Sequence, residues 1–286
     1  MPLDQESNLD KVYREIKQPE LVKEMTFLEH LDELRSHLKR SIILVLLMTT
    51  AAFFFKSFIF DVLIFGPVNL NFFTYRVLCE ISYLIYNSDT LCIKSFGFQI
   101  TNITMTGQFT MHLLVSFIVG IIVSFPFVAY ELWRFIKPAL SLSEQKKSKG
   151  MVLFIVLLFA SGVLFGYFLL SPVSIVFMGS YSISDNIGNL INLESYVGFV
   201  TTLSLGAGLL FQLPLVIYFL AKIGLISASL LSKYRRYAFV IILIVSAIVT
   251  PPDPASQIIL TIPIYLLYEF GIILAKKAEK QNLKTI

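Results

Sequence analysis

The chain has 286 residues and a formal net charge of +4, and 56% of its residues are hydrophobic while only 15% are charged. Soluble domains are about 45–50% apolar and about 25% charged, so this composition, with a mean hydropathy of +0.76, excludes an ordinary soluble globule. Disordered chains are polar and are excluded as well. Two cysteines are too few for a disulfide-rich scaffold.

Six apolar stretches follow one another along the chain, separated by charged residues or by clusters of Pro, Asn and Ser. They span residues 38–60, 108–133, 149–171, 196–221, 237–250 and 256–274. The first four are long enough to cross a bilayer, which takes about 20 residues of helix. The fifth has only about 14 residues and stops at two prolines. We therefore expect an all-α integral membrane protein with six transmembrane helices, of which the last two form a short hairpin.

The distribution of positive charge predicts the orientation. Of the 23 Lys and Arg residues, 20 lie in residues 1–40, 134–149, 222–236 and 276–284, and only three (Lys56, Arg76 and Lys94) lie on the side of the first loop. Cytoplasmic segments are enriched in Lys and Arg, so both termini are expected in the cytoplasm. Residues 1–24 then form a charged cytoplasmic arm, 25–275 the membrane domain and 276–286 a short basic tail.

Two carboxylates lie near predicted helix starts on the cytoplasmic side. The first is Glu33, and the apolar residues around it fall on one stripe of an amphipathic helix: Phe27, Leu31, Leu34 and Leu38. Glu33 lies on the opposite face, with no Lys or Arg three or four residues away. It is either a solvated surface charge or a carboxylate that is free to bind a cation. Glu144 either closes a capping box with Ser141 or offers a second such carboxylate.

Polar residues inside the apolar stretches are costly and tend to be functional. Glu131 and Arg134 are expected to form a local pair at the end of the second stretch. Gln212 lies just before a proline and either satisfies the carbonyl freed by that proline or docks another helix. Asp253 is expected to cap the last helix, and Glu269 lies deep enough in its helix to require a partner.

Two further features bear on chemistry. Cys79 and Cys92 lie in the same predicted outer loop, where they form either a disulfide or two buried thiols. The three histidines do not have metal-ligand spacing, and neither a phosphate-binding loop nor a serine nucleophile motif is present. We expect no enzymatic activity and no cofactor.

With these residues placed, the chain resembles the TatC family, the multi-span receptor subunits of the twin-arginine protein translocase, over roughly residues 25–275. Each matching motif is weak alone, but their order on six stretches is specific. The motifs are residues 30–35 (HLDELR), 124–126 (SFP), Trp133 with 135–140 (FIKPAL), Glu144, 165–168 (FGYF) with Pro172, 211–214 (FQLP), 235–237 (RRY), 250–253 (TPPD) with Gln257, and Glu269.

The resemblance implies a multi-pass protein of the cytoplasmic (inner) membrane that binds twin-arginine signal peptides of folded precursors. The family's signal-binding carboxylates fall on Glu33 and Glu144, and the same site is expected to include Arg35 and Phe135. Arginine presents a planar fork that pairs bidentately with a carboxylate, which lysine cannot reproduce.

The resemblance also implies single-span TatA/TatB-type partners, oligomeric assembly and transport driven by the proton-motive force. Polar contacts for the partners are expected at Gln212, Thr250 and Gln257, although the family commonly carries an acid where Gln212 stands. Other positions that the family needs fall on Pro67, Pro126, Asp253 and Glu269. The alternative is a small-solute secondary transporter, which predicts polar groups converging at the bilayer midplane rather than at the cytoplasmic interface.

Overall fold

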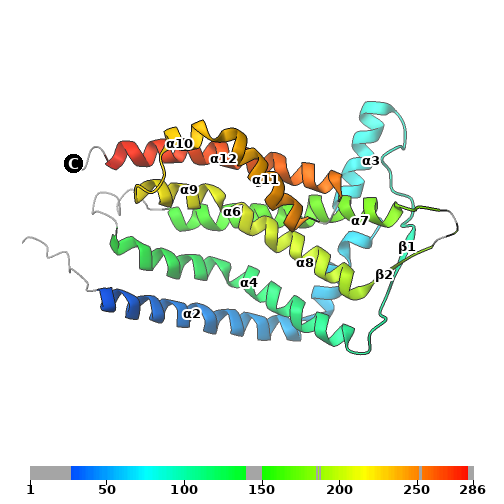
Figure 1. Cartoon of the computed structure of the whole chain (residues 1–286). Helices are drawn as coiled ribbons and strands as arrows, with labels where there is room; N and C mark the ends of the chain where they lie inside the picture. The colour runs from blue at the N-terminus through cyan, green and yellow to red at the C-terminus, as the bar shows by residue number, and fades with distance from the viewer. Residues whose placement is uncertain (1–26, 140–149, 185, 187, 251–252, 283–286) are drawn as a thin grey trace, which may run out of the picture.

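The computed structural model describes residues 27–139, 150–184, 186, 188–250 and 253–282. Its long helices lie roughly parallel or antiparallel in one bundle, with α2 and α12 at opposite edges (Figure 1). The elements are α2 (Phe27–Phe54), η1 (Phe58–Ile64), η2 (Gly66–Val68), α3 (Phe73–Tyr86), β1 (Phe98–Thr101), α4 (Gly107–Ile136), η3 (Lys137–Ala139), α6 (Met151–Phe165), η4 (Gly166–Leu170), α7 (Ser171–Ser180), β2 (Asn189–Asn192), α8 (Leu193–Leu210), α9 (Leu213–Lys222), α10 (Ala228–Lys233), α11 (Arg235–Val249) and α12 (Pro254–Asn282).

Five of the six expected apolar stretches form helices of membrane-spanning length, and the fifth stretch forms a shorter helix. In the described part of the chain, five helical segments are long and apolar enough to cross a membrane: Leu31–Phe54, Gly107–Ile136, Met151–Ser180, Leu193–Lys222 and Pro254–Lys280. The short fifth helix predicted from the sequence is α11, whose 15 residues reach about 22 Å, less than the bilayer core of about 30 Å.

Two predicted boundaries differ from the structure. The helix of the first stretch ends at Phe54 and gives way to η1, a π-helix over Phe58–Ile64. The last helix is not short: α12 has 29 residues and continues past the apolar stretch to Asn282. The residues of this extension are mostly charged or polar, and they favour helix as strongly as apolar ones do. The tail expected from residue 276 is thus helical as far as the structure describes it.

Small residues allow the helices to approach one another closely. A Cβ placed on Gly120 of α4 would lie 2.8 Å from the Cα of Thr49 in α2, and a Cβ on Gly166 of η4 would lie 2.8 Å from the Cα of Ser204 in α8. Such contacts are typical of helices that associate in lipid, where packing replaces the hydrophobic effect. Pro126 lies inside α4 without ending it. The preceding residue, Phe125, stacks on Phe159 of α6 with ring centroids 3.6 Å apart.

An ion pair joins α11 to α12, and a capping contact closes the start of α12. The partner of Glu269 is Arg235: the guanidinium Nη2 donates to Oε2 at 2.9 Å and Nε lies 2.8 Å from Oε1. The predicted N-cap is confirmed, because the carboxylate of Asp253, only 1% exposed, accepts the Ser256 amide at 2.6 Å and also the Ser256 hydroxyl. The ion pair therefore holds the two helices of the hairpin together, and the cap fixes where α12 begins.

A small cap lies at the end of the bundle away from the start of α2 (Figure 1). It consists of α3 and the two-stranded parallel sheet in which Phe98 of β1 pairs with Asn189 of β2. The buried Tyr75 hydroxyl donates to the carbonyl of buried Pro67 at 2.6 Å. Burial raises the pKa of Tyr75 above its usual value.

A disulfide joins Cys79 of α3 to Cys92 in the loop that follows, with 4.5 Å between the Cα atoms. In the same loop, Lys94 Nζ lies 2.5 Å from Asp89 Oδ2. The hydrogen bond and the charge of Lys94 hold the pKa of Asp89 below its usual value. The loop after α3 is thus tied back on itself by one covalent and one ionic contact.

We expect the protein isolated without reductant to gain the mass of two hydrogens on reduction. The two cysteines are 13 residues apart, and closing a loop of about 15 residues contributes about 3 kcal/mol in the chain-entropy description. Reduction should therefore speed proteolytic cleavage between residues 73 and 107. A Cys79→Ser variant, already cleaved fast, should not respond to reductant; an unchanged mass on reduction of the parent chain would rule the bond out.

Candidate functional site

Side chains of α2 and α4 meet at the end of the bundle where α2 begins and α4 ends. His37 Nδ1 lies 2.5 Å from Glu131 Oε2, and the two side chains are only 7% and 17% exposed. Arg40 Nη1 lies 4.0 Å from the same oxygen. The His37 ring also makes an edge contact with Phe135, with centroids 6.3 Å apart. We call Glu33, His37, Glu131 and Phe135 the α2–α4 cluster.

The local pair predicted between Glu131 and Arg134 is wrong for the described structure. The carboxylate of Glu131 is turned toward α2, where His37 Nδ1 and Arg40 Nη1 lie against it. Arg134, by contrast, is exposed. A pattern within one helix cannot reveal such a partner, because the partner comes from another helix.

The amphipathic segment at the start of α2 presents its polar face to the protein. His37 and Ser41 are buried and Glu33 is half-buried, whereas Leu31 and Leu38 are 43% and 54% exposed. The apolar stripe of this segment therefore faces largely outward, and it continues into exposed Ile42 and Leu46. Lipid accepts such a surface, so the usual inside–outside assignment of an amphipathic helix is inverted here.

Glu33 is the least satisfied member of the α2–α4 cluster. Its Oε2 atom is buried and has no hydrogen-bond partner among the described residues. A buried carboxylate oxygen without a donor is costly, and a cation that supplies hydrogen bonds relieves that cost. Glu33 is therefore not the solvated charge that spacing alone allows.

The other residues expected at this site are placed less completely. Arg35 is exposed on the same turn of α2 as Glu33. Glu144 lies in residues 140–149, outside the described residues, so its position relative to Glu33 remains a prediction. His37 and Glu131 were missed as site residues. The sequence does contain one sign of His37, because Glu33, His37 and Ser41 are polar residues spaced four apart and share one helix face.

Three polar residues were expected to contact partner helices. Gln212, between α8 and α9, donates from Nε2 to the Ile155 carbonyl of α6 at 3.3 Å, while its Oε1 is buried without a partner in the described chain. The amide therefore bonds to a neighbouring helix, not to a carbonyl of its own helix. Thr250 is buried and donates to the Ser246 carbonyl at 2.8 Å. Gln257 donates across the hairpin to the Leu243 carbonyl at 3.2 Å.

No group of three or more His, Cys, Asp or Glu side chains within the described ranges could hold a metal ion.

Replacing Glu131 with Ala should destabilise the fold by about 1–3 kcal/mol, because the buried His37 ring loses its partner. Thermal unfolding of the purified protein in detergent measures the change. Glu131→Gln, which keeps a hydrogen-bond acceptor, should lose less. Arg134→Ala, an exposed change on the same turn of α4, serves as the control; an equal loss in that variant would show that the contact with His37 is not what stabilises the helix pair.

The sequence is similar to those of known membrane proteins of one family. A family model described as "Sec-independent protein translocase protein (TatC)" matches residues 29–263. The chain is 40% identical over 260 residues to the Sec-independent protein translocase protein TatC of Blattabacterium sp. subsp. Periplaneta americana (strain BPLAN), covering 91% of this chain and 98% of that one. It is 31% identical to TatC of Aquifex aeolicus (strain VF5), covering 90% and 98%.

The fold is also similar to that of two solved structures. A crystal structure of the twin arginine translocase receptor TatC matches with a TM-score of 0.64 at 30% identity, covering 87% of this chain and 99% of that one. A second, in DDM, matches with a TM-score of 0.68 at 30% identity and covers 86% and 99%. The chain is thus a multi-pass membrane protein of a non-enzymatic translocase family. It belongs to the TatC family, at the core of Sec-independent protein translocation.

Proposed function

We propose that the chain binds the twin-arginine signal peptides of folded precursor proteins at the end of the bundle where α2 begins and α4 ends. The observation that carries this proposal is the buried Glu33 oxygen that lacks a donor. A guanidinium supplies two parallel N–H groups to a carboxylate and remains charged at any physiological pH. An arginine of the signal peptide is therefore a chemically matched partner for Glu33.

The second arginine is assigned to Glu144, on the resemblance of its surrounding motif to the family. Glu131 is less suited to this role, because His37 and Arg40 already lie against its carboxylate. Phe135 lies next to His37 and offers an aromatic face to a bound peptide. Arg35, exposed one turn before Lys39, completes the charged surface of the site.

The site is assigned to the cytoplasmic face of the inner membrane, with both termini in the cytoplasm. The excess of Lys and Arg in the segments at this end supports the assignment. The start of α2 and the end of α12 also lie at the same end of the bundle (Figure 1), as an even number of membrane crossings requires.

Recruitment of single-span TatA/TatB-type subunits is assigned to the α8–α9 junction, and export is assigned to the proton-motive force. Gln212 supports this best, because its Oε1 still lacks a donor. Side-chain amides join helices in lipid by about 1–2 kcal/mol in peptide models. Thr250 and Gln257 use their donors within the chain and are weaker candidates for the partner contact.

Crosslinking of a twin-arginine precursor in membrane vesicles tests the receptor assignment. Glu33→Gln and Glu144→Gln should each weaken capture about 10- to 100-fold, because a charge-assisted contact contributes about 1.5–3 kcal/mol when shielded from water. Where water reaches the contact, the loss falls to about fivefold or less. The variant that carries both Glu33→Gln and Glu144→Gln should capture the twin-arginine precursor weakly. The unchanged protein should capture a twin-lysine precursor equally weakly.

Glu80→Gln supplies the control, since Glu80 is an exposed carboxylate of α3 at the other end of the bundle. Equal crosslinking of the arginine and lysine precursors to every variant would mean that the contact is hydrophobic capture, and the assignment of Glu33 and Glu144 would fail.

A further inference from the structure

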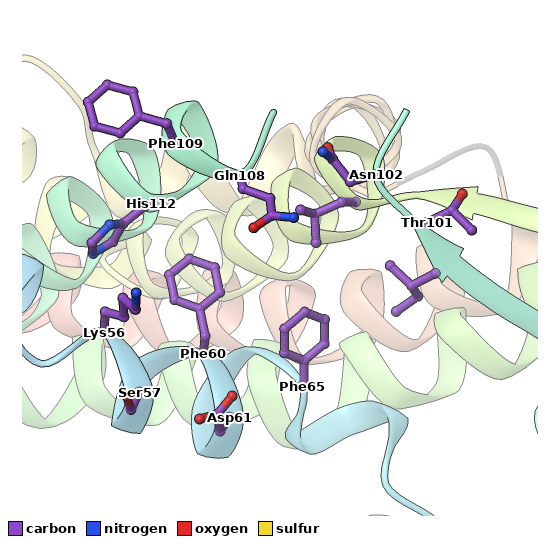
Figure 2. Close-up of a pocket in the computed structure, with 12 residues that line it drawn as sticks. Lys56, Ser57, Phe60, Asp61, Phe65, Thr101, Asn102, Gln108, Phe109 and His112 are labelled. Atoms are coloured by element: carbon purple, nitrogen blue, oxygen red, sulfur yellow. The ribbon is translucent and has the colours of Figure 1, made fainter. Parts of the chain in front are cut away.

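A second polar site lies at the end of the bundle opposite the α2–α4 cluster. A cavity of about 580 Å³ opens between η1, the first turns of α4 and β1. Figure 2 shows the side chains of Phe60 and Gln108 pointing into this space from its two walls, with Thr101 and Asn102 of the β1 region at its side. Its volume lies within the range of pockets that hold small organic groups.

The cavity exists because α2 does not continue as a regular helix. The Phe53 carbonyl near the end of α2 lies 3.0 Å from His112 Nε2 of α4, and the His112 ring stacks on the Phe53 ring with centroids 4.0 Å apart. The chain then widens into the π-helix η1, which supplies Phe60 and Asp61 to the cavity. Such π-helical turns occur frequently at functional sites. His112 is engaged in holding the wall and is not the ligand-binding group.

The cavity lies at the level of the membrane–water boundary. The apolar span of α2 ends at Phe54 and that of α4 begins at Gly107; the lining residue Lys56 lies two residues beyond the first limit, and Gln108 is the second residue of the α4 span. Large apolar side chains near the opening are strongly exposed: Phe54 (80%), Phe55 (67%), Phe58 (58%) and Phe109 (62%). Aromatic rings and lysines in this arrangement are typical of the layer where lipid headgroups meet the acyl chains.

The cavity carries one positive and one negative group that do not neutralise each other. Lys56 and Asp61 both line it, and within the described ranges neither forms an ion pair with the other or with any third residue. The chain does pair such groups elsewhere at this end, since Lys94 and Asp89 lie 2.5 Å apart. The site therefore offers a separate cation and a separate carboxylate, with no net charge.

We propose that this cavity binds the headgroup of a zwitterionic phospholipid that carries a primary ammonium, with the phosphate at Lys56 and the ammonium at Asp61. The amide of Gln108 donates to the phosphate, and the ring of Phe60 adds a cation–π surface for the ammonium. The acyl chains lie along the exposed phenylalanines. An anionic headgroup without an ammonium leaves Asp61 unpaired beside its phosphate, so the site favours the zwitterion.

Lipid retention by the purified full-length chain, followed by native mass spectrometry, tests the proposal. With phosphatidylethanolamine and phosphatidylglycerol offered at equal concentration, we expect about fivefold more retention of the former, the effect of one partly screened ion pair. Asp61→Asn should abolish this preference, and Lys56→Gln should weaken retention of both lipids. Both residues are exposed, so the substitutions leave the buried core intact.

Matched controls come from the ion pair outside the cavity. Asp89→Asn and Lys94→Gln remove the same charges at the same end of the bundle and should leave the preference unchanged. Glycerophosphoethanolamine, the headgroup without acyl chains, should not be retained; if it binds as well as the lipid, the ligand is a soluble zwitterion and the lipid assignment is overturned. Equal retention of the two lipids by the parent chain, or an unchanged preference in Asp61→Asn, overturns the proposal as a whole.

Discussion

A bilayer offers no water to a polar group, so every polar side chain within it has to find its partner in the protein. This constraint accounts for the α2–α4 contact. Because Leu31 and Leu38 can face lipid, the inward face of α2 is left to Glu33, His37 and Ser41. The same constraint pairs Arg235 with Glu269 across α11 and α12. The helices are joined by polar contacts as well as by small residues.

Most polar groups in the bundle satisfy this constraint, and the exceptions are informative. Glu33 and Gln212 each retain one buried oxygen without a donor among the described residues. Elsewhere, Ser and Thr hydroxyls mostly return their hydrogen bond to a carbonyl of the preceding helical turn, as Thr201 and Ser204 do. A carboxylate and an amide cannot satisfy their oxygens in that way, because they need a donor from outside the helix backbone. Among the described residues the hydroxyls of Thr49, Ser174 and Ser246 also lack a partner, but the carboxylate of Glu33 and the amide of Gln212 are the groups assigned to the precursor and to the partner subunits.

The helices could be predicted from the sequence because hydropathy and length alone define a spanning segment. The short α11 and the cap of Asp253 followed from local signals, namely two prolines and an acidic residue before a helix. The orientation of α2 could not be predicted, since periodicity shows which residues share a face but not which face is buried. The His37–Glu131 contact joins residues 94 positions apart, and the outer cavity requires a helix distortion and a distant strand. Neither leaves a trace in the local sequence.

The parallel pairing of β1 with β2 also sets an order of events during membrane insertion. Phe98 pairs with Asn189, and α4, α6 and α7 lie between these residues in the chain. The sheet can therefore close only after the chain has crossed the membrane and returned. Until then β1, one wall of the outer cavity, has an unpaired edge, and such an edge is open to wrong partners. The cap that contains β1 and β2 is thus completed only when β2 has arrived on the same side of the membrane as β1.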